Sequence, residues 1–197
     1  MRKILLLLCL VAVSLKSFSQ KELLLKFEKE RIGYSKKSML VLGGWSAADI
    51  IVSGIATNTS NREMRYFHQM NVMWGVINLA IAGLGYWSSG REKIDNPTLA
   101  AVLKHQSKTE KTYLVNTGLD MVYMGTGLLM TQTSNNQKNP DKFKGYGNSI
   151  MLQSGFLLVF DALNYAIHRK HGKQLNGLVE KLQINGGPGS VALRYTF

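Results

Sequence analysis

The sequence predicts an all-α protein: a four-helix transmembrane bundle of two tandem helical hairpins, preceded by an amphipathic helix and followed by a short C-terminal β-hairpin. Four apolar stretches, separated by connectors rich in Asn, Ser, Gly and Lys, cover residues 39–57, 72–87, 113–131 and 150–167. At a helical rise of about 1.5 Å per residue, most of these stretches approach the roughly 30 Å thickness of a bilayer core. The two halves also resemble each other, because Asp49 and Asp120 both begin an Asp-x4-Gly pattern in an apolar stretch.

These stretches lack the charged outer face that a helix in water normally keeps. Residues 72–87 contain no ionisable side chain, and each of the other three stretches contains one acid. Together they form the expected membrane domain, residues 39–171. A soluble periplasmic bundle of buried helices remains the alternative fold.

Residues 1–19 have the three parts of an export signal. Arg2 and Lys3 form a charged start, residues 4–13 form a run without charges, and Ser17 and Ser19 provide a small-x-small cleavage site. The run is about half as long as the roughly 20 residues of a spanning helix, which favours a signal over an uncleaved anchor. Because the only cysteine, Cys9, lies in this segment, disulfides and thiolate chemistry are excluded from the mature chain.

The segments on either side of the membrane domain have different patterns. Residues 20–38 place Leu23, Leu24 and Phe27 among several Lys, Arg and Glu residues, which is typical of an amphipathic helix. It either lies on the membrane surface or packs on the bundle. Residues 172–197 form the tail, in which two short alternating runs flank a Gly-rich turn and predict the β-hairpin.

The formal charge of +12 makes membrane lipids the expected partner. The basic residues are scattered over every connector and match no nucleic-acid-binding motif, so no nucleic acid partner is expected. We expect a multi-pass protein of a bacterial envelope membrane, the inner one slightly favoured, with an unidentified membrane protein or a second copy as a further partner. The orientation is open, because a cleaved signal places most Lys and Arg outside, against the positive-inside rule.

Polar side chains in the apolar stretches are the candidate site. On an insertion scale, a central Asp costs about 2.5 to 3.5 kcal/mol, so each needs polar partners inside the bundle. Helical spacing directs the polar side chains to one interior, and the expected ligand-binding residues there are Asp49, Asn78, Asp120, Asp161 and Asn164. They either hold an ion, a proton or a small ligand, or they bond to one another and set the helix register.

Other site types find no support. No nucleophile motif or HExxH-type metal motif is present, so we expect no enzyme, no catalytic residue, no metal and no cofactor. The four histidines are scattered, and His68 is expected at the opposite end of the bundle from His168.

The segments Met39-Leu-Val-Leu-Gly-Gly-Trp45 and Tyr66-Phe-His-Gln-Met-Asn71, followed by Trp74, Asn78 and Ile81-Ala-Gly83, resemble an uncharacterised family of small four-pass membrane proteins from Bacteroidetes. The resemblance implies the four-pass architecture and no activity. It draws attention to polar and aromatic residues around the first hairpin: Trp45, His68, Gln69, Asn71, Trp74 and Asn78. Of these, His68, Asn71 and Trp74 join the candidate site.

Three functions remain open at this point. The first is a binding or permeation module with a polar intramembrane site. The second is a structural or partner-binding membrane protein without a ligand, and the third is the soluble periplasmic bundle.

Overall fold

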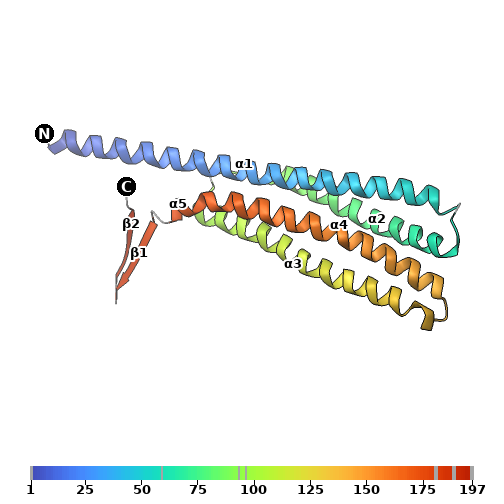
Figure 1. Cartoon of the computed structure of the whole chain (residues 1–197). Coiled ribbons are helices and arrows are strands. Elements are labelled where there is room, and N and C mark those ends of the chain that lie inside the picture. Colours follow the sequence, from blue (N-terminus) through green and yellow to red (C-terminus); the bar gives the residue numbers. More distant parts are fainter. Residues whose placement is uncertain are drawn as a thin grey trace.

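Four long helices build the molecule, as the sequence predicts (Figure 1). The computed structural model describes the backbone of residues 2–195 apart from 59, 93, 96, 180, 181, 188 and 189, and the side chains of residues 21–177 with the same internal gaps. The long helices are α1 (Arg2–Ala56), α2 (Arg62–Arg91), α3 (Leu99–Gln132) and α4 (Pro140–Gly172). The expected signal falls on residues whose side chains lie outside the described part.

The shorter elements are the 3-10 helices η1 (Ser134–Asn136) and η2 (Lys173–Leu175), the short helix α5 (Asn176–Val179), and the antiparallel strands β1 (Leu182–Gly187) and β2 (Ser190–Tyr195). The expected β-hairpin falls on this terminal stretch, whose side chains also lie outside the described residues.

Consecutive helices run in opposite directions. The α1–α2 and α3–α4 connections lie at one end of the bundle, and both termini lie at the other (Figure 1). Each long helix after the first begins at a side-chain cap, which satisfies backbone N–H groups that have no partner within the helix. Asn61 caps α2, Thr98 caps α3 and Asn139 caps α4, where Pro140 follows as the first helical residue.

The first long helix joins two regions that the sequence pattern separates. Residues 21–38 and the first apolar stretch form one continuous helix, α1. Leu24 and Phe27 of its first half are buried with Val102 of α3 and Leu175 of η2. This half therefore contacts the bundle at the end that carries the termini.

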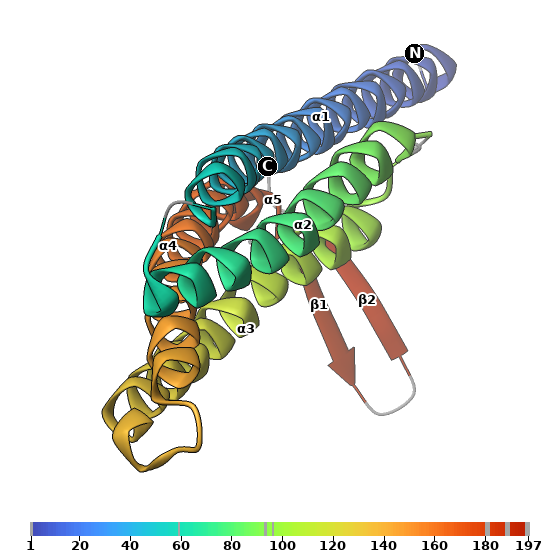
Figure 2. The ribbon, with the colours of Figure 1, turned by 90° about the vertical axis from the view of Figure 1, so that its right-hand side faces the viewer.

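The four helices do not pack equally. α1 packs mainly on α2, α3 on α4, and α2 on α4, whereas α2 and α3 make little direct contact. Figure 2 shows the four helices from the end that carries the α1–α2 and α3–α4 turns. Glycine allows the close pairs, since a Cβ on Gly147 of α4 would lie 2.7 Å from the carbonyl oxygen of Gly127 on α3.

A water-soluble bundle usually buries apolar side chains and exposes polar ones, and this bundle shows the reverse distribution. Among the described residues, buried polar side chains outnumber buried apolar ones. The large apolar side chains that are exposed lie almost entirely in the four apolar stretches, as with Ile55, Leu84, Val122 and Leu163. The bundle thus has a polar interior and an apolar surface.

Within the described residues, two helical segments are long and apolar enough to cross a membrane, Lys21–Ala56 and Pro140–Leu175. This finding rests on length and composition only. α2 and α3 are not among these candidate spans. Their apolar stretches contain polar residues, including Asn78, Asn116 and Asp120.

Candidate functional site

The polar interior contains two separate groups of side chains. The first, which we call the Asn71 network, joins α1, α2 and α4 through Asp49, Ser53, Asn71, Ser149 and Gln153. Gln153 Nε2 donates to Asp49 Oδ2 at 2.8 Å and to Asn71 Oδ1 at 3.2 Å. Ser149 Oγ donates to the same Asn71 oxygen at 2.5 Å, while Asn71 Nδ2 donates to Ser53 Oγ at 3.2 Å.

Two side chains at its border complete the Asn71 network. Trp45 Nε1 donates to Gln153 Oε1 at 3.2 Å, and His68 Nδ1 lies 3.3 Å from Ser53 Oγ. Among the described residues, no buried polar atom of the network lacks a hydrogen-bond partner. These residues therefore satisfy one another, as buried polar groups usually do.

The second group lines a groove of about 990 Å³ between α2 and α3. α1 and α4 contribute to its lining where α2 and α3 stand apart. Its apolar lining comes from all four helices and includes Met39, Leu42, Ile81, Leu119, Leu157 and Phe160. We call it the α2/α3 groove, and its volume is at the upper end of the range for small-molecule pockets.

Three buried polar atoms of residues that line the α2/α3 groove have no hydrogen-bond partner among the described residues: Trp74 Nε1, Asn78 Nδ2 and Asp120 Oδ2. Asn78 and Asp120 are each only 3% exposed. A buried polar atom without a partner costs about 1 to 3 kcal/mol relative to a paired one. In contrast to the Asn71 network, this region has unused hydrogen-bonding capacity.

Asp161 adds a second carboxyl group to the groove. It interacts with Asp120 across the α3–α4 contact and accepts a hydrogen bond from Asn116. No described Lys or Arg forms a salt bridge with either acid. Two adjacent carboxylates repel each other, so the pair favours a shared proton.

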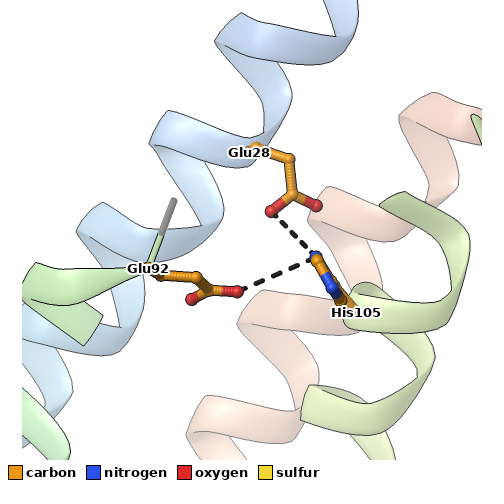
Figure 3. A group of neighbouring side chains, drawn as sticks. All are labelled: Glu28, Glu92 and His105. Atoms are coloured by element: carbon orange, nitrogen blue, oxygen red, sulfur yellow. Dashed lines mark hydrogen bonds and ion pairs between the residues drawn. The ribbon is translucent and has the colours of Figure 1, made fainter. Parts of the chain in front are cut away.

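At one end of the α2/α3 groove lies a cluster of charged side chains, which we call the mouth cluster. Glu28 of α1, Glu92 at the end of α2 and His105 of α3 point toward one another (Figure 3). His105 Nδ1 lies 3.4 Å from Glu28 Oε2 and 3.8 Å from Glu92 Oε1. Arg31 completes the cluster, with Nη2 2.7 Å from Glu28 Oε2 and hydrogen-bonded to Glu92 Oε1.

The mouth cluster has the ligand types and spacing of a metal site, since its three ligand atoms lie within 4.8 Å of one another. However, one guanidinium nitrogen of Arg31 already bridges the two carboxylates. Burial lowers the pKa of Arg31, but the hydrogen bonds and charges of Glu28 and Glu92 outweigh burial and raise it. The cluster is therefore an ion-pair cluster that connects α1 to the ends of α2 and α3.

The comparisons with known proteins identify the family. The model of a family of unknown function (DUF6992) matches residues 41–162, more than half of the chain. The chain belongs to DUF6992. No curated protein and no solved structure matches it. The matched part of this DUF6992 protein contains both the Asn71 network and the groove acids, whereas Glu28 and Arg31 precede it.

The structure divides the residues expected to form one site in this DUF6992 protein. Asp49, Asn71 and His68 lie in or beside the Asn71 network, while Trp74, Asn78, Asp120 and Asp161 line the groove. Asn164 belongs to neither group, because it accepts a hydrogen bond from Ser38 and donates to the Phe160 carbonyl oxygen at 2.7 Å.

Gln153, which bonds to Asp49, Asn71 and Trp45, was not among the expected site residues. Its signal is present in the sequence, since it is an amide within an apolar stretch. The mouth cluster was not expected either. Arg31 and Glu92 are 61 positions apart, so no local pattern could indicate their contact.

Proposed function

We propose that this DUF6992 protein is a multi-pass membrane protein of the Bacteroidetes cell envelope that binds a small ligand in the α2/α3 groove. One observation carries the proposed site: the three unpaired polar atoms of Trp74, Asn78 and Asp120 belong to residues of the same groove. In a medium of low dielectric constant, such atoms gain more from a hydrogen-bonded ligand than they would in water.

The distribution of side chains supports a membrane location. Lipid chains can solvate the exposed apolar surface, whereas water cannot do so without cost. Aromatic and basic side chains meet near the end of α2, where the Arg91 guanidinium lies 4.1 Å from the Trp87 ring centroid and Lys36 lies 5.5 Å from that of Tyr86. Such pairs are typical of a membrane–water interface. Membrane lipids are then the direct partners of all four helices.

A fractionation experiment tests the membrane location. The protein is expressed with its own N-terminus, and the membranes are washed with alkaline carbonate. We expect the protein to stay with the membranes. Release into the wash as a monodisperse protein would instead favour the soluble periplasmic bundle and would overturn the proposal.

A carbodiimide that is soluble in lipid tests the site, because it reacts with protonated carboxyl groups in apolar surroundings. Washed membranes are treated with dicyclohexylcarbodiimide, and the labelled peptides are identified by mass spectrometry. We expect the label on Asp120 or Asp161, which face each other in the groove, and its loss in a double variant with Asn at both positions. Asp49 is the matched internal control, because Gln153 and Ser53 already bond its two oxygens.

The outcomes separate the two membrane functions. Label on the groove acids means that the groove admits a small molecule from the lipid. Equal label on Asp49, or none on any of the three acids, would overturn the site and favour a structural membrane protein without a ligand.

A further inference from the structure

We propose that the ligand is a long-chain alcohol, or a lipid with a free hydroxyl group, which enters the α2/α3 groove with its hydroxyl toward Trp74, Asn78 and Asp120. This inference rests on the proposed membrane location and binding site, and it names the chemical class of the ligand.

The hydrogen-bonding capacity of the three unpaired atoms matches one hydroxyl group. Trp74 Nε1 and Asn78 Nδ2 are donors, while Asp120 Oδ2 is an acceptor. A hydroxyl oxygen has two lone pairs and one proton, so it can accept two hydrogen bonds and donate one. In number and direction of hydrogen bonds, one hydroxyl group therefore matches the three atoms.

The three side chains lie at the same level of the bundle. Trp74 and Asn78 are four residues apart on α2 and therefore share a helix face. The ring of Trp74 contacts that of Tyr123 on α3, with centroids 5.5 Å apart. Because Tyr123 lies three residues after Asp120, the carboxyl group is within one helical turn of the Trp74 contact.

The chemistry of the site disfavours ions at this position. A metal cation would face the N–H groups of Trp74 and Asn78, which are donors and cannot act as ligands. A carboxylate or phosphate would face the two acids Asp120 and Asp161, which interact with each other. A neutral group that both donates and accepts fits this mixed environment.

The remainder of the groove fits an extended hydrocarbon chain. From Asp120 toward the mouth cluster, the lining includes Leu42, Met39 and Ile81, and it reaches Lys108. The twelve residues from Lys108 to Asp120 correspond to about 18 Å of helix. The chain of the alcohol would lie along this length, and its far end would lie near the mouth cluster.

The test uses the full-length protein in lipid nanodiscs and a hexadecanol that carries a diazirine at the end away from the hydroxyl. Light should attach it to peptides near the mouth, within residues 85–91 or 108–113. Unlabelled hexadecanol, hexadecyl methyl ether and hexadecane then compete for the site. The ether accepts hydrogen bonds and donates none, so it reports on the bond to Asp120.

We expect hexadecanol to compete at roughly tenfold lower concentration than the ether, because a hydrogen bond to a charged or shared carboxyl is among the stronger ones. Asp120→Leu should reduce this preference to about twofold or less. Trp74→Phe should weaken the alcohol and the ether alike by roughly fivefold. Asp49→Asn, in the Asn71 network, is the matched control and should keep the tenfold preference.

Several results would overturn the proposal. Competition by the ether or by hexadecane that equals that of hexadecanol excludes an alcohol site, because the unpaired atoms of Asn78 and Asp120 would then not bond to the hydroxyl group. Labelling spread over all lipid-facing helices excludes it as well. If these results occurred while dicyclohexylcarbodiimide still labelled Asp120 or Asp161, the groove would remain a site and only the ligand class would be wrong. Trp74→Phe keeps the test decisive if Asp120→Leu does not fold.

Discussion

The Asn71 network and the α2/α3 groove contain the same kinds of residue in opposite states. Asp49 and Asn71 in the network are fully paired through Gln153 and its neighbours. Asn78 and Asp120 in the groove each keep an unpaired buried atom. An acid and an amide inside an apolar bundle therefore indicate a binding site only where their hydrogen bonds are incomplete.

Helix packing explains the difference. At the network, α2 packs closely on α1, so that a Cβ on Gly75 would lie 3.2 Å from the Ser46 carbonyl oxygen. Close backbones allow short side chains from three helices to reach one another. At the groove, α2 and α3 make little contact, and their polar side chains lack partners across the space.

Among the variants of the two regions, Gln153→Ala should lower the free energy of unfolding most. It removes one hydrogen bond each from Asp49, Asn71 and Trp45, so we expect a loss of about 4 kcal/mol in the free energy of unfolding in detergent. Leu152→Ala is the matched control, since the neighbouring side chain is 43% exposed, and it should cost far less. Similar losses for the two variants would mean that the network does not stabilise the fold.

His168 lies outside both regions, and its titration measures how much an unpaired buried group lowers the free energy of unfolding. Burial, together with the charge of His171, lowers the pKa of His168 to about 4, and neither ring nitrogen has a partner among the described residues. Below pH 6.5 the unfolded chain therefore binds more protons than the folded one, and stability falls as the pH decreases toward 4. The expected loss is about 3 kcal/mol over this window.

The measurement for His168 is the melting temperature between pH 7 and 4. His168→Phe keeps a ring beside Tyr113, whose centroid lies 5.4 Å from that of His168, and it should make the profile flatter. A variant profile as steep as that of the wild type would assign the acid sensitivity to other groups.

The two acids should respond differently to neutralisation. Asp49→Asn changes a carboxylate that accepts hydrogen bonds from Gln153 and Ser53, and it should cost about 1 to 2 kcal/mol of stability. Asp120→Asn relieves the contact with Asp161 and should leave stability equal or raised. Unfolding with a graded denaturing detergent measures the stability of both variants. A greater loss of stability for Asp120→Asn than for Asp49→Asn would contradict the assignment of Asp49 as the paired acid and Asp120 as the unpaired one.

Trp74→Phe should have the smallest effect on stability. Its N–H group has no partner within the described part of the chain, while its ring packs beside Tyr123, and phenylalanine keeps the aromatic contact. We expect a change of about 0.5 kcal/mol or less, with ligand binding as the property that changes. By contrast, Trp45→Phe removes the bond to Gln153 and should cost about 1 kcal/mol. Equal effects of the two tryptophan variants would show that the groove is not open.

The sequence predicts the helices well because the length and the position of apolar stretches are local properties. The four apolar stretches can be read directly from the chain. The continuity of α1 was not predicted, because the change from an amphipathic to an apolar pattern at residue 38 resembles a boundary while the backbone continues through it. The sequence predicts one group of site residues, whereas the structure has two, with Asp49 in the Asn71 network and Asp120 at the groove. Sequence could not separate them, since Asp49 and Asp120 occupy equivalent positions in the two halves.

Residue type and spacing along the chain are enough to predict four helices with acids and amides in apolar surroundings, because both are properties of a single helix. That Asp49 is paired with Gln153 while Asp120 borders a groove follows only from the packing of the helices. Hydrogen-bond partners within a bundle come from other helices, so pairing depends on how closely those helices approach.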